Sequence, residues 1–294
     1  MPAASLTDRG VVRVAGEDAR SFLDGLVTSA MDRVTPGHAR YAALLTPQGK
    51  ILFDFLVAEA PEELGGGFWL DGPRALAQDL AKRLGFYKLR AKVTVENLSA
   101  TWGVAASWDE SPPAGTGGFV FPDPRSPDLG HRAIVPCDEA ERIASAPAEA
   151  WHAHRIAIGV PEGGRDFAYG ETFPHEADMD QLGGVDFDKG CYVGQEVVSR
   201  MEHRGTARTR IVPVRFPGGY SPPGGCEAVA GDKALGRIGE PVPGGHALAM
   251  LRLDRLSDAL EAGLQPTAGG LPFVASKPRF ARFPFPGEAD KAGA

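Results

Sequence analysis

The sequence predicts an α+β protein that ends in a small antiparallel β-barrel, and three observations lead to this class. Strand and helix patterns alternate as β-α-β-β-β-α-β over residues 11–95. The composition turns to Pro, Gly, Ser and Asp over residues 109–130, which is typical of a loop or linker. After Gly205, short alternating apolar runs are separated by turn residues, as in small barrels and sandwiches. The order of elements favours a sheet with helices on one face over a doubly wound parallel sheet.

The N-terminal part is expected to hold five strands and two helices. Alternating or apolar runs predict strands at residues 11–14, 41–45, 51–57, 68–70 and 93–95. Apolar residues at helical spacing predict helices over residues 19–27 and 74–84. The run Thr46-Pro47-Gln48-Gly49-Lys50 separates the second and third strands and predicts a β-hairpin.

The C-terminal part resumes after the expected linker. We predict a strand at 133–135, a helix over 148–158 that begins after Pro147, and a helix over 195–203. Barrel strands are expected at residues 210–216, 234–238, 247–253 and 272–280. These patterns divide the chain into a 1–207 domain of two α+β subdomains and a 208–294 barrel domain.

The composition excludes several classes of protein. The chain has 294 residues, of which 43% are hydrophobic and 23% charged, and this is ordinary for a soluble globular protein. The net charge of −7 argues against general nucleic-acid binding. No apolar run reaches the length of a membrane span, and the N-terminus resembles neither a signal peptide nor a transit peptide. We therefore expect a cytoplasmic protein without a membrane partner.

The three cysteines, Cys137, Cys191 and Cys226, are few, odd in number and far apart. This spacing argues against a disulfide framework and against a C-x-x-C redox or zinc site. Three thiolates cannot by themselves supply the four ligands of a standard iron–sulfur cluster. Any cluster would have to be shared, transient or held partly by other ligands.

One of these cysteines stands in the most compact motif of the chain, Lys189-Gly190-Cys191-Tyr192-Val193-Gly194-Gln195-Glu196. A thiol reacts as the thiolate, and its pKa falls near a lysine or a helix N-terminus. Both conditions are predicted here, because Lys189 precedes the thiol and a helix is expected to begin at Gln195. The alternative is a turn with a buried, inert cysteine.

Basic residues crowd just after this motif: Arg200, His203, Arg204, Arg208 and Arg210. They predict a site for a carboxylate or phosphate, with a solvated helix end as the alternative. His152 and His154 point apart on the predicted helix, which is poor for chelation, so no metal site is predicted. Phosphate-loop, dinucleotide, zincin and serine-hydrolase motifs are absent from the sequence.

Three elements occur in order within Arg155 to Glu196: R-I-x-x-G-V-P, P-H-E-A-D and K-G-C-Y-V-G-Q-E. Together with the hairpin at residues 44–50, they resemble the YgfZ-type folate-binding proteins, which assist iron–sulfur cluster assembly and repair. That family is related to the T-protein of the glycine cleavage system, an aminomethyltransferase that uses tetrahydrofolate. The resemblance implies a ring of two α+β subdomains with a terminal β-barrel and a folate at the centre.

The resemblance also assigns individual residues. Glu176 of P-H-E-A matches the position that holds the pterin, where a carboxylate can accept two parallel hydrogen bonds from the 2-aminopterin edge. Asp54 lies where T-proteins carry an acidic pair, but Phe53 replaces the second acid. Aminomethyl transfer would then rest on one carboxylate. Cys191, by contrast, is central to the YgfZ-type signature and is not needed by a T-protein.

We therefore predict a tetrahydrofolate-binding accessory protein for iron–sulfur enzymes, with Cys191 as the working thiol and Lys189 favouring its thiolate. The predicted contacts of tetrahydrofolate, or of a one-carbon derivative, are Glu176, Asp54, Tyr192, Gln195, Glu196 and Arg204. Tyr192 could instead pack on a neighbouring strand, and Gln195 and Glu196 could instead fix the helix start. The expected partners are iron–sulfur client enzymes or cluster carrier proteins.

Two alternatives remain open from the sequence. A folate-dependent aminomethyltransferase or demethylase would depend on Asp54 and not on Cys191. A plain folate-binding or RNA-interaction module would depend on the basic patch around Arg204.

Overall fold

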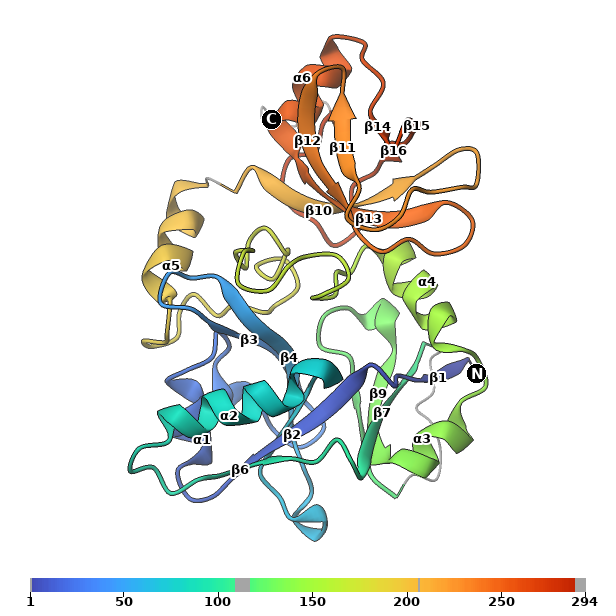
Figure 1. The fold of residues 1–294 in the computed structure, drawn as a ribbon. Helices are drawn as coiled ribbons and strands as arrows, with labels where there is room; N and C mark the ends of the chain where they lie inside the picture. Colours follow the sequence, from blue (N-terminus) through green and yellow to red (C-terminus); the bar gives the residue numbers. More distant parts are fainter. Residues whose placement is uncertain (1, 109–116, 206, 289–294) are drawn as a thin grey trace, which may run out of the picture.

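The computed structural model describes residues 2–108, 117–205 and 207–288. Within these residues the strands form three sheets whose paired strands are antiparallel. Figure 1 shows the most C-terminal sheet at one end of the molecule, with the other two sheets beside each other at the opposite end. The α+β class with a C-terminal barrel is confirmed.

The first sheet has the strand order β3-β4-β5-β2-β6. Its strands are β2 (Arg9–Ala15), β3 (Arg40–Leu45), β4 (Ile51–Glu59), β5 (Phe68–Pro73) and β6 (Thr94–Asn97). The helices of this part are α1 (Ala19–Asp24) and α2 (Ala77–Tyr87), with short 3-10 turns η1 (Met31–Arg33), η2 (Glu62–Leu64) and η3 (Arg74–Leu76). Leu80 and Leu84 of α2 are buried in one cluster with Val12 and Leu70 of the sheet, so the helical spacing of the leucines attaches α2 to the sheet.

The second sheet has the order β1-β7-β9-β8. Its strands are β1 (Ala3–Ser5), β7 (Trp102–Ser107), β8 (Phe119–Pro122) and β9 (His131–Pro136), and α3 (Cys137–Ile143) and α4 (Ala148–Ile158) follow. The expected linker at 109–130 is wrong for residues 119–129, which hold β8 and the 3-10 turn η4 (Pro127–Leu129). Phe121 is buried there although Pro and Gly surround the strand. Residues 109–116 of the expected linker lie outside the described residues.

The third sheet forms the nearly closed C-terminal barrel, in the order β15-β14-β11-β12-β13-β10-β16. Its strands are β10 (Thr209–Arg215), β11 (Glu227–Ala230), β12 (Lys233–Ile238), β13 (His246–Arg252), β14 (Thr267–Ala268), β15 (Leu271–Pro272) and β16 (Val274–Ala275). The strand expected at 272–280 is wrong beyond residue 275, since Pro278 cannot donate to a ladder. Helix α6 (Leu253–Glu261) was not expected, and it buries Leu253, Leu256 and Ala259.

A long connection without helix or strand, residues 159–194, joins α4 to α5 (Gln195–Arg204). Figure 1 shows it running between the two N-terminal sheets and the barrel. Its residues Met179 and Leu182 belong to one buried cluster with Tyr41 of β3, Ile134 of β9 and Leu248 of β13. The segment that carries the P-H-E-A-D and K-G-C elements therefore forms part of the core that the three sheets share.

Buried ion pairs also cross between these parts. Arg9 of β2 donates to Asp71 of β5 at 2.7 Å and to Glu162 of the connection at 3.2 Å. Arg155 of α4 contacts Glu162 at 3.2 Å and Asp166 at 2.5 Å. Because these side chains are almost fully buried, each charge depends on its partner.

Candidate functional site

Cys191 lies in the loop just before α5 and is exposed to solvent. Gly194 ends this loop with a left-handed backbone (φ 82°), a conformation that favours glycine. A Cβ atom placed on Gly194 would lie 2.5 Å from the carbonyl oxygen of Thr46 and 3.1 Å from Cα of Gly49. The second glycine of the motif is therefore required because the cysteine loop packs closely on the β3–β4 hairpin turn.

Lys189 anchors the same loop at its other end. Its ammonium donates to the carbonyl oxygens of Asp24, Val27 and Ser29 at 2.7, 2.8 and 3.0 Å, and the Asp24 carboxylate lies 3.4 Å away. The side chain is only 2% exposed, and burial lowers the pKa of the ammonium against the opposing charge of Asp24. All three protons of the ammonium are thus directed to the segment from the end of α1 to η1. The predicted effect of Lys189 on the Cys191 thiolate stays a prediction.

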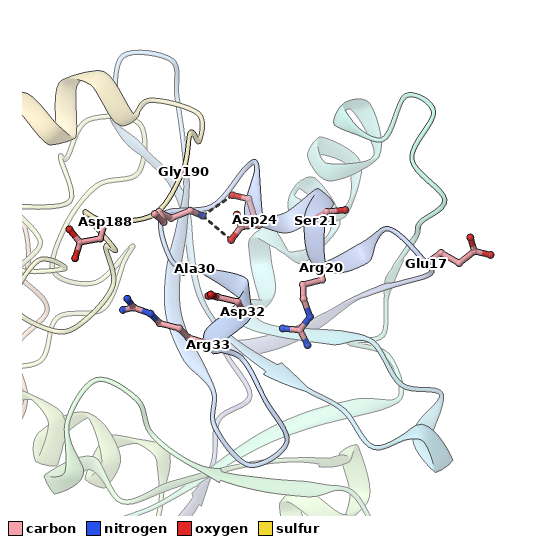
Figure 2. Close-up of a pocket in the computed structure, with 10 residues that line it drawn as sticks. Glu17, Arg20, Ser21, Asp24, Ala30, Asp32, Arg33, Asp188 and Gly190 are labelled. Carbon is pink, nitrogen blue, oxygen red and sulfur yellow. Dashed lines mark hydrogen bonds and ion pairs between the residues drawn. The ribbon is translucent and has the colours of Figure 1, made fainter.

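A cavity of about 510 Å³ opens beside this loop. Figure 2 shows α1 and η1 on one side of it and the segment with Asp188 and Gly190 on the other. Charged side chains of both signs line it, among them Arg20, Asp32 and Arg33. We call it the α1 pocket. No sequence pattern predicted it, because its walls lie far apart in the chain.

Glu176 lies beside the hairpin as well. Its carboxylate accepts the backbone N–H of Phe173 at 2.9 Å, and the ammonium of Lys50 lies 4.0 Å away. The same ammonium stands 3.2 Å from the centre of the Phe173 ring. Glu176 remains 22% exposed, so part of its carboxylate is open to a ligand.

Asp54 has a different environment, since it is 2% exposed. One carboxylate oxygen accepts the hydroxyl of Tyr41 at 2.8 Å, and the other accepts the hydroxyl of Tyr169. Burial, together with the adjacent Asp54 charge, raises the pKa of each tyrosine hydroxyl well above the usual value for tyrosine. Neither tyrosine was expected as a partner. Tyr169 comes from the distant 159–194 connection, and Tyr41 comes from β3, the strand paired with β4.

The remaining predicted residues lie around α5. Tyr192 is buried in the shared core, with its ring centre 5.4 Å from the Lys189 ammonium, and burial raises its pKa to about 12. Gln195 is the first residue of α5, and Glu196 pairs with Arg200 on the helix surface. Arg204 is exposed at the last position of α5. Their predicted contacts with folate stay predictions.

The basic cluster after the motif does not form one patch. Arg210 is buried, and its guanidinium contacts Asp180 at 2.6 and 3.0 Å and donates to the carbonyl oxygen of His175 at 2.6 Å. Arg208 instead approaches Asp254 of α6 at 3.8 Å. Arg210 therefore connects the barrel to the P-H-E-A-D segment. It is not available to an external anion, because its guanidinium already pairs with buried acids.

Within the described ranges of the chain, two groups of His, Asp and Glu have ligand atoms within 4.8 Å of one another: Asp8 with His152 and Glu162, and His175 with Asp180 and Glu202. Arginine side chains already contact both groups, since Arg155 pairs with Glu162 and Arg210 with Asp180. These guanidinium groups neutralise the carboxylates that a metal would need. Both groups are therefore explained as ion-pair networks.

The β3–β4 hairpin is the common neighbour of the three predicted sites. Gly49 lies against Gly194 in the cysteine loop, Lys50 contacts Glu176, and Asp54 stands on β4. In the sequence, Lys50 of the hairpin and Glu176 lie more than 100 residues apart. The fold brings them to one hairpin.

Two family models and a solved structure define the fold class of this protein. The model of the GCVT N-terminal domain matches residues 5–106, and the model of the CAF17 C-terminal beta-barrel domain matches residues 208–283. The crystal structure of glycine cleavage system aminomethyltransferase T from Bartonella henselae superposes with a TM-score of 0.73 at 14% identity, covering 95% of this chain and 86% of that one. The protein therefore has the T-protein-like fold with a C-terminal β-barrel.

The relatives narrow this class to a family. An IBA57 homologue of Mycosarcoma maydis, described as a mitochondrial iron–sulfur cluster assembly factor, is 35% identical to this chain. The alignment covers 90% of this chain and 68% of the homologue. Human IBA57 is 33% identical and covers 87% of this chain and 78% of its own length. The chain belongs to the IBA57 family of iron–sulfur cluster assembly factors.

One expectation is corrected by these relatives. We expected a cytoplasmic protein because the N-terminus carries no evident targeting signal, but the IBA57 relatives, among them those of human and mouse, are described as mitochondrial. The cytoplasmic expectation is therefore wrong, since an N-terminal composition alone does not determine the compartment. In the described part of the chain, no helix combines the length and hydrophobicity needed to span a membrane.

Proposed function

We propose that this protein acts in the assembly or repair of iron–sulfur enzymes and that Cys191 is its working thiol. The observation that carries the proposal is an exposed cysteine in a loop held at both ends, by Lys189 and by Gly194. The relatives named as iron–sulfur cluster assembly factors support this role. The narrower YgfZ-type assignment, with tetrahydrofolate as a ligand, is part of the proposal.

The position of the thiol suits a shared ligand. Cys137 begins α3 and Cys226 lies just before β11, so neither belongs to the loop of Cys191. One thiolate supplies a quarter of the ligands of a standard cluster. Cys191 would therefore complete the coordination of iron or of a cluster that a client enzyme or carrier protein mostly holds.

Deletion and rescue test this role. In a strain without the protein, we expect iron–sulfur enzymes to lose activity and the wild-type chain to restore it. Enzymes without clusters, measured in the same extracts, serve as the control and are expected to keep full activity. Unchanged iron–sulfur activities in the deletion strain would remove the proposed function.

We propose Glu176 as the residue that holds the folate. Its partly exposed carboxylate, beside Lys50 and the Phe173 ring, offers hydrogen-bond acceptors and an aromatic surface to a pterin. The Glu176→Gln variant should bind tetrahydrofolate at least about tenfold more weakly, since a hydrogen bond to a charged group contributes about 1.5–3 kcal/mol. Titration calorimetry with tetrahydrofolate measures this change.

The control for this titration is Glu171→Gln, an exposed glutamate close enough to Lys50 to affect its pKa. Its affinity for tetrahydrofolate is expected to equal that of the wild type. Equal affinities of all three proteins would show that Glu176 does not contact the ligand. No binding even by the wild type would remove folate from the proposal and leave the iron–sulfur role to its own test.

A second function receives less support from the site. An aminomethyltransferase would need Asp54 to meet the folate amine, but both oxygens of Asp54 accept tyrosine hydroxyls in a buried position. Phe53 stands where T-proteins carry the second acid. We therefore propose no aminomethyl transfer.

A further inference from the structure

The end of α2 and the loop that follows it carry apolar side chains in solvent. Phe86 is 66% exposed and Leu89 is 90% exposed. Residues 82–92, which we call the α2 tip, also contain five cations and no carboxylate. The cations are Lys82, Arg83, Lys88, Arg90 and Lys92. The tip is therefore strongly positive although the chain as a whole has a net charge of −7.

The backbone of the tip directs Leu89 outward. Leu89 has a φ of 42°, a left-handed value that is uncommon for a bulky residue other than glycine. Leu84 and Val93, on either side of it in the chain, are buried in the core of the first sheet. A strained backbone that exposes a leucine is the kind of feature that concentrates at functional sites.

The charges of the tip are largely available to a partner. Lys92 pairs with Glu17 at 2.7 Å. Among the residues that the structure describes, the other four cations have no side-chain hydrogen bond or ion pair. The tip therefore combines four cations that have no such partner with two exposed apolar side chains.

The tip is continuous with the surface around the thiol. Glu17, the partner of Lys92, lines the α1 pocket together with Gly190, the residue before Cys191. Figure 2 shows Glu17 and Gly190 at opposite ends of the pocket. The α2 tip and the α1 pocket are thus linked by the Lys92–Glu17 pair, and the pocket reaches the residue that precedes the thiol.

We propose that this surface is the docking site for an acidic iron–sulfur protein whose cluster faces Cys191. The proposal rests on the proposed function and names the chemistry of the partner. Phe86 and Leu89 would enter an apolar depression on the partner, as aromatic and apolar anchors do at interface centres, while the cations steer an acidic surface toward them. An anionic lipid surface would use the same side chains, but it gives no reason for the continuity with Cys191.

Photocrosslinking tests the proposal. The full chain, with p-benzoylphenylalanine in place of Phe86, is irradiated in cells, and the adducts are identified by mass spectrometry. We expect adducts with acidic proteins that bind iron–sulfur clusters. Their yield should fall about tenfold in the Lys88→Glu/Arg90→Glu background, because reversed charges weaken the encounter. The matched control is Lys233→Glu/Arg237→Glu on the exposed surface of the barrel, which should leave the yield unchanged.

Four results would overturn the proposal. These are adducts with lipid alone, adducts only with proteins that hold no cluster, an adduct yield that charge reversal does not change, and no adducts at all. Iron–sulfur enzyme activity in the same cells separates this failure from failure of the proposed function. If Lys88→Glu/Arg90→Glu keeps wild-type activity while Cys191→Ser loses it, the docking surface is wrong and the function stands. If deletion of the whole protein leaves the activities intact, the function itself is wrong.

Discussion

Replacing Arg9 by methionine is expected to lower the free energy of unfolding by about 3–5 kcal/mol, the usual cost of leaving a buried charge without its partner. Arg9 pairs with Asp71, which is fully buried, and with Glu162. Burial opposes the ionisation of Glu162, but the His152 hydrogen bond and the charges of Arg155 and Arg9 lower its pKa well below the usual value. Without Arg9, Arg132 at 3.6 Å is the one cation left beside the Asp71 carboxylate among the residues that the structure describes.

Urea unfolding monitored by circular dichroism measures this loss. The matched control is Arg142→Met on the surface of α3, where Arg142 lies 3.9 Å from Asp138 and both side chains are exposed. An exposed pair contributes about 0–1 kcal/mol, so the control should stay within about 1 kcal/mol of the wild type. Equal losses in the two variants would contradict the importance of the buried network.

Replacing Lys189 by methionine is expected to reduce iron–sulfur enzyme activity in rescued cells about tenfold, because correct positioning of a reactive group commonly carries effects of this size or larger. Methionine fills a similar volume but leaves the carbonyl oxygens of Asp24, Val27 and Ser29 without their donor. The loop that presents Cys191 would then lose its anchor on the segment from Asp24 to Ser29. Stability should fall by about 1–3 kcal/mol, the cost of unsatisfied buried groups.

A second measurement separates positioning from activation of the thiol. The rate of Cys191 alkylation, followed against pH, reports the pKa of the thiol. The prediction that Lys189 favours the thiolate requires the midpoint to move to higher pH in Lys189→Met. An unchanged midpoint would leave Lys189 with the positioning role alone, because its ammonium is directed to three carbonyls.

Local sequence signals predicted elements with clear ends. Helix α4 begins after Pro147 and ends at Gly159, whose left-handed backbone (φ 94°) closes it. The β3–β4 hairpin followed from two apolar runs around a Pro-Gly turn. In both cases the residues that define the ends are neighbours in the sequence, so the pattern contains the required information.

Contacts between distant segments were not predictable in this way. Arg210 belongs to a run of basic residues in the sequence, but the fold buries it against Asp180. Lys189 stands beside Cys191 in the chain, but its ammonium turns to the carbonyls after α1. Asp54 was expected to face a ligand, whereas Tyr41 and Tyr169 enclose it. Charge patterns in a sequence show which groups need partners, and only the fold determines which partners they meet.

The most direct test of the proposed thiol is the rescue of a deletion strain by Cys191→Ser. Serine keeps the size of the side chain but removes the thiolate, and Cys191 is exposed, so the fold should be retained. We expect iron–sulfur enzyme activities to remain at the level of the deletion strain, while Cys226→Ser, a change outside the loop, restores them fully. Full rescue by Cys191→Ser would contradict the central role of this thiol.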